Sequence, residues 1–253
     1  MELFNLKGKV AIITGSSRGI GRAIAERLAE AGARVVISSR KAEPCEAVAA
    51  AIRKAGREAV AIPCNISDKL QLQRLVDETH KAFGPVDILV ANAASNPYFG
   101  PSAGMPDEVF TKVMNNNVLS AHWLCHMVRP DMAAKKDGAI VIVSSIGGLR
   151  ATAELGVYGI SKAADMALGR NLALEFGPDN IRVNCIAPGL VKTDFARALY
   201  EDDNRRKAVE AGTPLRRLGD PDDIAGIAVL LASRAGAFIT GQVIVADGGV
   251  TIR

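Results

Sequence analysis

Tyr158 and Lys162 lie four residues apart in a stretch with the apolar spacing of a helix. Residues at that separation share one face of a helix, so both side chains can point into the same cleft. A phenol has an ordinary pKa of about 10, which makes it a weak base at neutral pH. A nearby ammonium stabilises the phenolate and lowers that pKa. The pair therefore predicts Tyr158 as an acid/base that exchanges a proton with a carbonyl or alcohol oxygen.

Ser145 precedes this pair and follows the apolar run Ala139–Ser144, for which we predict a strand. In an open α/β sheet, ligands bind beyond the carboxyl ends of the strands, which is where this serine would lie. Its hydroxyl can then donate a hydrogen bond to the oxygen that Tyr158 protonates. A Tyr-x-x-x-Lys pair alone arises by chance in many helices. The additional serine at a strand end favours a catalytic role for the pair and predicts that Ser145 contacts the substrate.

A glycine-rich turn follows the apolar run Val10–Thr14 and precedes a helical pattern. Glycines in that context let the backbone turn tightly and approach a pyrophosphate, whose charge the helix N-terminus stabilises. The strand–turn–helix order distinguishes this loop from an ordinary turn. We therefore predict dinucleotide contacts from Gly15, Ser17, Arg18, Gly19, Ile20 and Gly21.

The end of the next predicted strand bears on which dinucleotide binds. An acidic residue there would hold the ribose 2′-hydroxyl of NAD, but this chain has Ser39 and Arg40. Arg40 can offer a planar fork of donors to a 2′-phosphate, and Ser39 leaves room for it. Arg18 in the glycine loop is a second basic candidate. These residues favour NADP(H) over NAD(H).

Short runs rich in Val, Ile, Leu and Ala recur along the chain, as strands covered on both faces do. We predict strands at Val10–Thr14, Arg34–Ser39, Ala59–Pro63, Ile88–Ala91, Ala139–Ser144, Arg182–Ala187 and Gln242–Ala246.

Longer stretches with helical spacing, such as Ile20–Ala31 and Leu70–Phe83, separate these strands. The alternation predicts an α/β fold: one Rossmann domain over residues 1–253, with a doubly wound seven-stranded parallel sheet and helices on both faces. The segment Gly189–Gly219 is the least regular, and a long segment of this kind predicts a substrate-binding lid. Candidates for an apolar substrate pocket are Tyr98, Phe99, Leu149, Leu155, Leu190, Phe195 and Leu199.

Composition excludes several classes of protein. The 253 residues are 49% apolar and 23% charged, which is typical of a globular protein. No apolar run is long enough to span a bilayer, and we read no secretory signal, so we expect a cytoplasmic protein. The net charge is only +4, and the basic residues are dispersed along the chain, so the charge does not suggest nucleic acid as a partner. The four cysteines form no C-x-x-C pair and His122 and His126 lack a third ligand, so we predict no metal site.

The glycine loop and the Ser–Tyr–Lys set resemble the short-chain dehydrogenase/reductase (SDR) superfamily over nearly the whole chain. The loop matches T-G-x-x-x-G-x-G, and Asn92-Ala93-Ala94 matches N-A-G with Ala94 in place of the glycine. The segments NAASNPYFGP (92–101), SSRK (38–41) and NCIAPGLVKT (184–193) look like the NADPH-dependent carbonyl and retinal reductases of the dehydrogenase/reductase family. Asn184 and Pro188-Gly189 match N-x-x-x-P-G.

This resemblance implies further roles. Asn117 would complete an Asn–Ser–Tyr–Lys tetrad by anchoring a water in the proton relay, and Lys162 would also bind the nicotinamide ribose. Asn65 would accept a hydrogen bond from the adenine amino group, and Ile66 would flank the ring. Other cofactor contacts would come from Asn92, Ala93, Ala94, Tyr158, Pro188, Gly189, Val191 and Thr193. The resemblance also implies a homotetramer.

The resemblance and the residues together predict an NADP(H)-dependent oxidoreductase that reduces apolar ketones or aldehydes. One alternative is a 3-oxoacyl-acyl-carrier-protein reductase, although such enzymes usually carry an arginine where this chain has Leu174. Another is a dinucleotide-binding sensor without catalysis. A sensor could dispense with Ser145, Tyr158 or Lys162, and the presence of all three weighs against it.

Overall fold

Seven parallel strands form one sheet in the order β3-β2-β1-β4-β5-β6-β7. The computed structural model describes residues 2–253, apart from the side chain of Ala198. The strands are β1 (Val10–Thr14), β2 (Arg34–Ser38), β3 (Ala59–Ala61), β4 (Ile88–Ala91), β5 (Gly138–Val143), β6 (Ile181–Pro188) and β7 (Val243–Ala246). The predicted parallel doubly wound sheet is thus confirmed, with strand boundaries within two residues of those expected.

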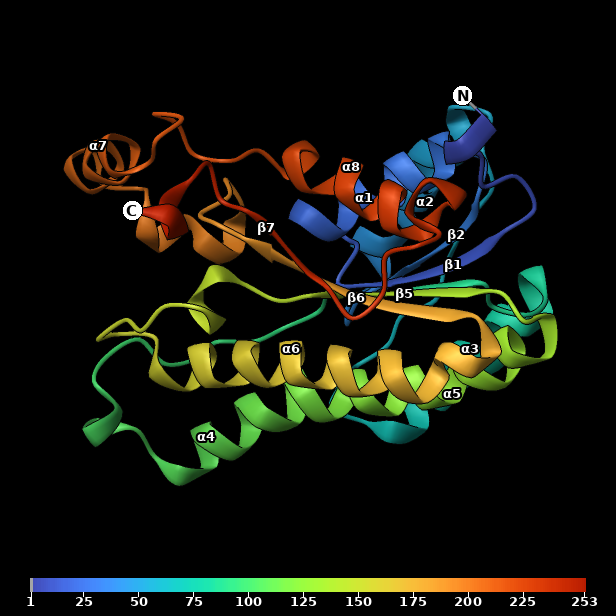
Figure 1. Cartoon of the computed structure of the whole chain (residues 1–253), viewed down its shortest axis with the longest axis horizontal. Helices are drawn as coiled ribbons and strands as arrows, with labels where there is room; N and C mark the ends of the chain where they lie inside the picture. Colours follow the sequence, from blue (N-terminus) through green and yellow to red (C-terminus); the bar gives the residue numbers. More distant parts are fainter. Residues whose placement is uncertain (1) are drawn as a thin grey trace.

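Helices cover both faces of this sheet (Figure 1). They are α1 (Gly19–Glu30), α2 (Ala42–Lys54), α3 (Lys69–Phe83), α4 (Asp107–Met114), α5 (Ser120–Lys135), α6 (Gly156–Phe176), α7 (Asp203–Gly212) and α8 (Pro221–Ala232). Helices α1, α2 and α8 pack in one apolar core, and α3, α5 and α6 in the other. Because side chains alternate along a strand, Ile13 belongs to the first core and its neighbour Ile12 to the second.

Strands β2 and β3 are added on one side of β1, and strands β4 to β7 are added on its other side. The order of the strands therefore switches between β1 and β4, which pair in parallel in the middle of the sheet. A crevice opens at such a switch point, beyond the carboxyl ends of the two strands. Thr14 joins the two ends: its Oγ1 accepts hydrogen bonds from the backbone N–H groups of Asn92 and Ala93, both at 3.1 Å. The glycine loop after β1 is thereby fixed to the loop after β4.

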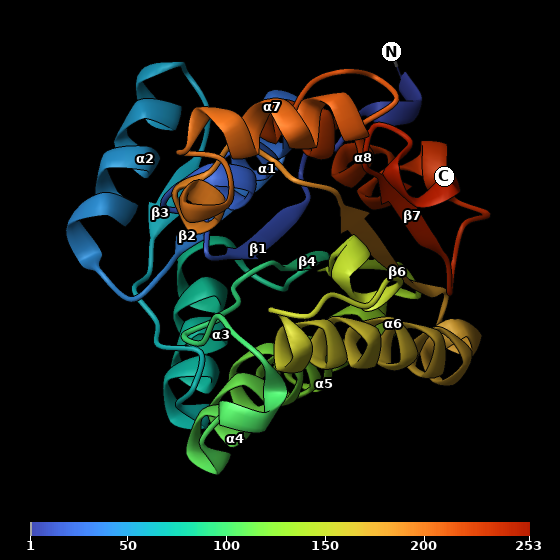
Figure 2. The ribbon, with the colours of Figure 1, turned by 90° about the vertical axis from the view of Figure 1, so that its left-hand side faces the viewer.

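The irregular segment predicted between Gly189 and Gly219 folds as a 3-10 helix (Asp194–Leu199) followed by α7. Its two ends are tied by backbone hydrogen bonds, from Lys192 N to Gly219 O at 2.9 Å and from Gly219 N to Leu190 O at 3.0 Å. Helix α7 buries none of its described residues. Figure 1 shows it beyond the ends of α1 and α8, and in Figure 2, which looks onto that end of the molecule, it lies in front of α1. The segment is therefore an excursion anchored at both ends over the carboxyl edge of the sheet.

Within residues 2–253, none of the helices has the length and apolar character needed to cross a membrane.

A substitution of Phe176, at the end of α6, tests how much the core between α5 and α6 contributes to stability. Its ring is fully buried and meets the His126 ring edge-on, with centroids 5.4 Å apart. We expect Phe176→Ala to lower the free energy of unfolding by about 3–5 kcal/mol, because the cavity adds to the lost transfer energy. Urea denaturation measures the change. Leu70→Ala is the control: Leu70 is 81% exposed, and its loss should cost less than about 0.5 kcal/mol. Equal losses in both variants would contradict this account of the core.

Candidate active site

A cleft of about 1190 Å³ opens at the carboxyl edge of the sheet. The residues predicted to contact a dinucleotide all line it: Gly15, Ser17, Arg18, Gly19, Ile20, Gly21, Ser39, Arg40, Asn65, Ile66, Asn92, Ala93, Ala94, Tyr158, Lys162, Pro188, Gly189, Val191 and Thr193. Ser145, Leu155 and Phe195 line the same cleft. The fold thus brings the glycine loop and the Ser–Tyr–Lys set to one cavity.

Two glycines of the loop lie too close to neighbouring atoms to be replaced by any residue with a side chain. A Cβ at Gly21 would lie 2.4 Å from the Gly15 carbonyl oxygen and 2.5 Å from Asn92 Nδ2. Gly15 has φ +67°, in the left-handed region, and a Cβ there would lie 2.8 Å from Asn92 Nδ2. That amide donates to the carbonyl oxygens of Thr14 at 2.9 Å and Gly15 at 3.2 Å. Asn92 therefore holds the loop from the β4 side.

Helix α1 begins directly after this loop, and Arg18 at its N-cap makes no capping hydrogen bond with its side chain. The first N–H groups of a helix have no partner within it, and they carry partial positive charge. Gly19, Ile20 and Gly21, the first three residues of the helix, all line the cleft. The loop therefore fits the pyrophosphate of a dinucleotide, in agreement with the sequence pattern.

Two arginines lie at the far end of this part of the cleft. The Arg18 Nη1 atom lies 3.3 Å from Asp194 Oδ2, and both side chains are largely exposed. Arg40 makes no hydrogen bond or ion pair with any other described residue. Ser39 Oγ lies 3.1 Å from Cys45 Sγ. An anion at the end of β2 would thus meet the Arg40 guanidinium, which has no partner among the described residues, whereas the Arg18 guanidinium is paired with the irregular segment.

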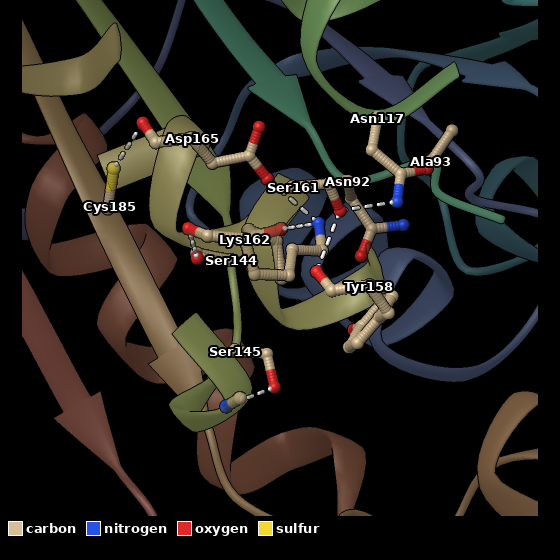
Figure 3. A network of polar contacts seen from close by, with 12 residues as sticks. Asn92, Ala93, Asn117, Ser144, Ser145, Tyr158, Ser161, Lys162, Asp165 and Cys185 are labelled. Carbon is tan, nitrogen blue, oxygen red and sulfur yellow. Dashed lines mark hydrogen bonds and ion pairs between the residues drawn. The ribbon is translucent and has the colours of Figure 1, made fainter. Parts of the chain in front are cut away.

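Helix α6 carries Tyr158 and Lys162 on the face that borders the cleft (Figure 3). The Lys162 side chain is 3% exposed, and its Nζ donates to Val143 O and to Asp165 Oδ2, both at 2.9 Å. The ammonium also lies 5.7 Å from the centre of the Tyr158 ring. Burial alone lowers the pKa of Lys162, but the charges of Asp165 and Tyr158 outweigh burial and raise it above its ordinary value. The ammonium is therefore charged next to the phenol.

The end of β5 presents two serines with different environments. Ser144 is buried and its Oγ donates to the Lys162 carbonyl oxygen at 2.7 Å, which ties β5 to α6. Ser145 is half-buried and its Oγ accepts from Gly147 N at 3.1 Å. A Cβ at Gly147 would lie 3.4 Å from Ser145 Oγ and 3.8 Å from Tyr158 Cε1, so the Ser145 hydroxyl and the Tyr158 ring are neighbours across the cleft.

Asn117 is the one predicted site residue that does not line the cleft; its neighbour Asn116 does. Asn117 lies in a π-helical turn (Asn115–Leu119) between α4 and α5. Its Oδ1 accepts from Ser95 N at 2.8 Å, and its Nδ2 donates to Ser95 O at 3.1 Å and to Ser161 Oγ at 2.9 Å. The side chain thus joins the loop after β4 to α6, and only the backbone at this turn remains for the predicted contact with water.

The hydrogen bonds of the Asn65 side chain also differ from those that we expected. Its Oδ1, which we expected to accept from the adenine amino group, already accepts from Ser67 N at 3.3 Å and from Ser67 Oγ at 3.0 Å. Its Nδ2 has no partner among the described residues and remains available as a donor. The half-buried Ile66 lies beside it and lines the cleft.

Apolar side chains line the other end of the cleft. The Phe195 ring lies 6.0 Å from the Tyr158 ring, and Leu155 precedes the first turn of α6. The other candidates Phe99, Leu190 and Leu199 also line the cleft, whereas Tyr98 and Leu149 do not. Three further apolar residues line it that the sequence did not single out: Val209, Leu215 and Val250. Most of this set comes from the irregular segment, whose path the sequence pattern does not define.

Asp165 is the buried charge that sequence reasoning missed. It lies three residues after Lys162, on the same face of α6, and its side chain is 1% exposed. An acidic residue on the apolar face of a predicted helix, one turn from a candidate catalytic lysine, is the signal that could have identified it.

Gly21→Ala tests the close packing of the loop. The added methyl cannot fit without moving backbone, so we expect a loss of about 1–3 kcal/mol in unfolding free energy. Affinity for a nicotinamide dinucleotide should fall at least about tenfold, since the loop and the start of α1 must separate. Gly226→Ala in α8 is the matched control, because a Cβ there meets no atom within 4 Å. Dinucleotide fluorescence titration and urea denaturation provide the two readouts, and unchanged affinity in Gly21→Ala would contradict the assignment.

Comparison with known proteins agrees with this geometry. A family model described as enoyl-(acyl carrier protein) reductase matches residues 15–251. The chain is 42% identical to dehydrogenase/reductase SDR family member 4 of Bos taurus over 244 residues, which is 96% of this chain and 88% of the relative.

Solved structures extend the comparison. A gluconate 5-dehydrogenase from Burkholderia cenocepacia, in complex with NADP and tartrate, is 31% identical with a TM-score of 0.95, covering 100% of this chain and 98% of that one. A 7α-hydroxysteroid dehydrogenase complexed with NADH and 7-oxo glycochenodeoxycholic acid is 37% identical with a TM-score of 0.94, covering 98% and 96%. The two solved structures hold NADP and NADH in a fold of this kind, and this chain thus belongs to the short-chain dehydrogenase/reductase family of oxidoreductases.

Proposed function

We propose that this protein transfers hydride between NADP(H) and a carbonyl/alcohol pair, and that it reduces apolar ketones or aldehydes with Tyr158 as acid/base. The observation that carries this proposal is that Tyr158, Lys162 and Ser145 border the same cleft as the glycine loop. A proton donor and a dinucleotide site in one cavity are the two requirements for carbonyl reduction.

NADPH supplies the hydride when bound, and the side chains of the cleft supply the proton and the orientation. Ser145 Oγ donates a hydrogen bond to the carbonyl oxygen and directs it toward the neighbouring Tyr158. Tyr158 then donates its phenolic proton to that oxygen as negative charge develops there. Lys162 stabilises the resulting phenolate, because its ammonium is held against the ring by two acceptors. In the oxidative direction Tyr158 takes the proton back.

The preference for NADP(H) rests on Arg40, Arg18 and Ser39. The Arg40 guanidinium follows β2 where an acidic residue would hold a bare ribose, and Arg18 in the glycine loop is a second cation at the same cleft; both favour a 2′-phosphate. Relatives of known structure bind either form: NADP is bound in the gluconate 5-dehydrogenase and NADH in the hydroxysteroid dehydrogenase. The basic pair is the feature of this chain that favours the phosphorylated form.

An apolar carbonyl substrate fits the Phe195 and Leu155 end of the cleft, because desolvation of apolar surface is the main source of affinity there. The description of the matching family model keeps an acyl-carrier substrate as a second candidate. Leu174 is 83% exposed and offers an acidic carrier no cation, which favours the first candidate. Turnover of an aromatic ketone, an aliphatic aldehyde and retinal would support that candidate. Turnover of an acetoacetyl thioester alone would support the second.

We propose further that the protein acts as a cytoplasmic homotetramer without nucleic-acid or membrane partners. Large apolar side chains such as Phe238 and Ile252 are more than four-fifths exposed in the single chain, which favours burial in a subunit interface. Sedimentation of the purified protein measures the assembly.

Tyr158→Phe tests the acid/base. Removal of one hydroxyl should lower kcat for reduction by about 10²–10⁴-fold, the usual contribution of a positioned proton donor, while NADPH still binds. Nicotinamide absorbance measures turnover, and fluorescence titration measures binding. Tyr98→Phe is the control, because the Tyr98 hydroxyl donates only to Pro101 O, at 2.8 Å, and its ring does not line the cleft. Full activity in Tyr158→Phe would refute the proposed chemistry.

Arg40→Ala tests the cofactor preference. Loss of a charge-assisted contact with the 2′-phosphate should weaken NADPH binding by about tenfold or more and leave NADH binding unchanged. Lys54→Ala removes the same charge from the exposed end of α2 and should not change the ratio of the two affinities. An equal loss for both cofactors in Arg40→Ala, or a wild-type preference for NADH, would contradict the preference for NADP(H).

A further inference from the structure

The catalytic lysine is held by an ion pair within its own helix. Lys162 Nζ lies 2.9 Å from Asp165 Oδ2, and the two side chains are 3% and 1% exposed. The second carboxylate oxygen, Oδ1, is buried and has no hydrogen-bond partner among the described residues. Lys162 is thus the only hydrogen-bond donor to this carboxylate in that part of the chain.

This arrangement is a poor means of stabilising the fold. Two buried charges lose their hydration, and a carboxylate with one unpartnered oxygen recovers only part of the cost. An apolar residue at position 165 would pack between α6 and the sheet without that cost. The carboxylate is therefore explained better by what it does for Lys162 than by fold stability.

The pair fixes the orientation of the ammonium. An ammonium has three N–H donors. One is directed to Val143 O at the end of β5 and one to Asp165 Oδ2, which leaves a third for the cleft that Lys162 borders with Tyr158. Figure 3 shows Asp165 and Tyr158 along the same helix, with Lys162 between them.

Few other ionisable groups surround this pair. Tyr158 faces it from α6, Cys185 from β6 and Cys125 from α5. Burial raises the pKa of the Cys185 thiol to about 12 and that of the Cys125 thiol further, so both thiols are neutral at working pH. The ionised pair packed beside Tyr158 on α6 is therefore Lys162 and Asp165.

We propose that Asp165 is a positioning residue for the catalytic step: its carboxylate holds the Lys162 ammonium charged and directed toward Tyr158, and so sets the pH range over which the Tyr158–Lys162 pair retains its proton. This inference rests on the proposed function, because reduction requires the protonated pair. A negative charge beside the pair opposes loss of that proton, whichever of the two groups releases it.

Asp165→Asn tests this inference, because it keeps the shape of the side chain and removes its charge. The readout is kcat/KM for reduction of an apolar ketone at saturating NADPH, measured across the neutral and alkaline range. We expect the alkaline limb of the profile to move to lower pH by about one unit or more, since the pair then loses its proton more easily. A uniform loss of activity with an unmoved limb would show a merely structural role and overturn the inference.

Asp87→Asn is the matched control. Asp87 is also a buried carboxylate, with Lys135 Nζ at 2.7 Å, but it precedes β4 at the opposite edge of the sheet. This variant should lose stability and keep the wild-type pH limb. An equal shift in both variants would overturn the inference.

A denaturation cycle provides a readout that does not require activity. Asp165→Leu leaves a buried ammonium without its counterion, so it should unfold at a lower urea concentration than the double variant Lys162→Met/Asp165→Leu. The cycle also needs the single variant Lys162→Met. If the losses of unfolding free energy in Asp165→Leu and Lys162→Met simply add up to the loss in the double variant, the carboxylate does not hold the ammonium, and the inference is overturned. If the wild type reduces no carbonyl, the proposed function fails by that result alone, whereas the cycle reports on the ion pair.

Discussion

The site depends on a charge that is kept inside the protein. The Lys162 ammonium is almost fully buried between the end of β5 and the face of α6, and two acceptors at 2.9 Å compensate for its lost hydration. An uncompensated ammonium would release its proton and could not stabilise a phenolate. Ser144 reinforces the same junction by donating to the Lys162 carbonyl oxygen. The position of Tyr158 follows from this junction, because both residues stand on one helical face.

The second half of the site depends on close backbone packing rather than on charge. Gly15 and Gly21 allow the loop after β1 to contact Asn92, and Thr14 bonds to the backbone beyond β4. These contacts lie at the point where the strand order reverses, so the sheet topology itself opens the crevice. Asn117 and Ser161 extend the connection from the loop after β4 to α6. The dinucleotide half and the proton-transfer half are thus linked by hydrogen bonds between buried or half-buried groups.

The two ends of the cleft differ in construction. The end formed by the strand termini and helix starts uses backbone geometry, which suits a cofactor common to many reactions. The other end draws Phe195, Leu199 and Val209 from a segment that leaves the sheet and returns to it. Side chains on such a segment can vary without disturbing the sheet, which is how one fold serves different substrates.

The order of residues along the chain was enough to predict the sheet, the glycine loop and the Ser–Tyr–Lys set. Continuous apolar runs identify buried parallel strands, and an i, i+4 spacing places Tyr158 and Lys162 on one face; both are local properties. It did not determine that Asp165 pairs with Lys162, that the Asn117 side chain is occupied by Ser95 and Ser161, or which side chains of residues 189–219 face the cleft. These features follow from the packed fold, because burial and hydrogen-bond partners depend on which distant elements pack together, and no sequence period encodes that packing.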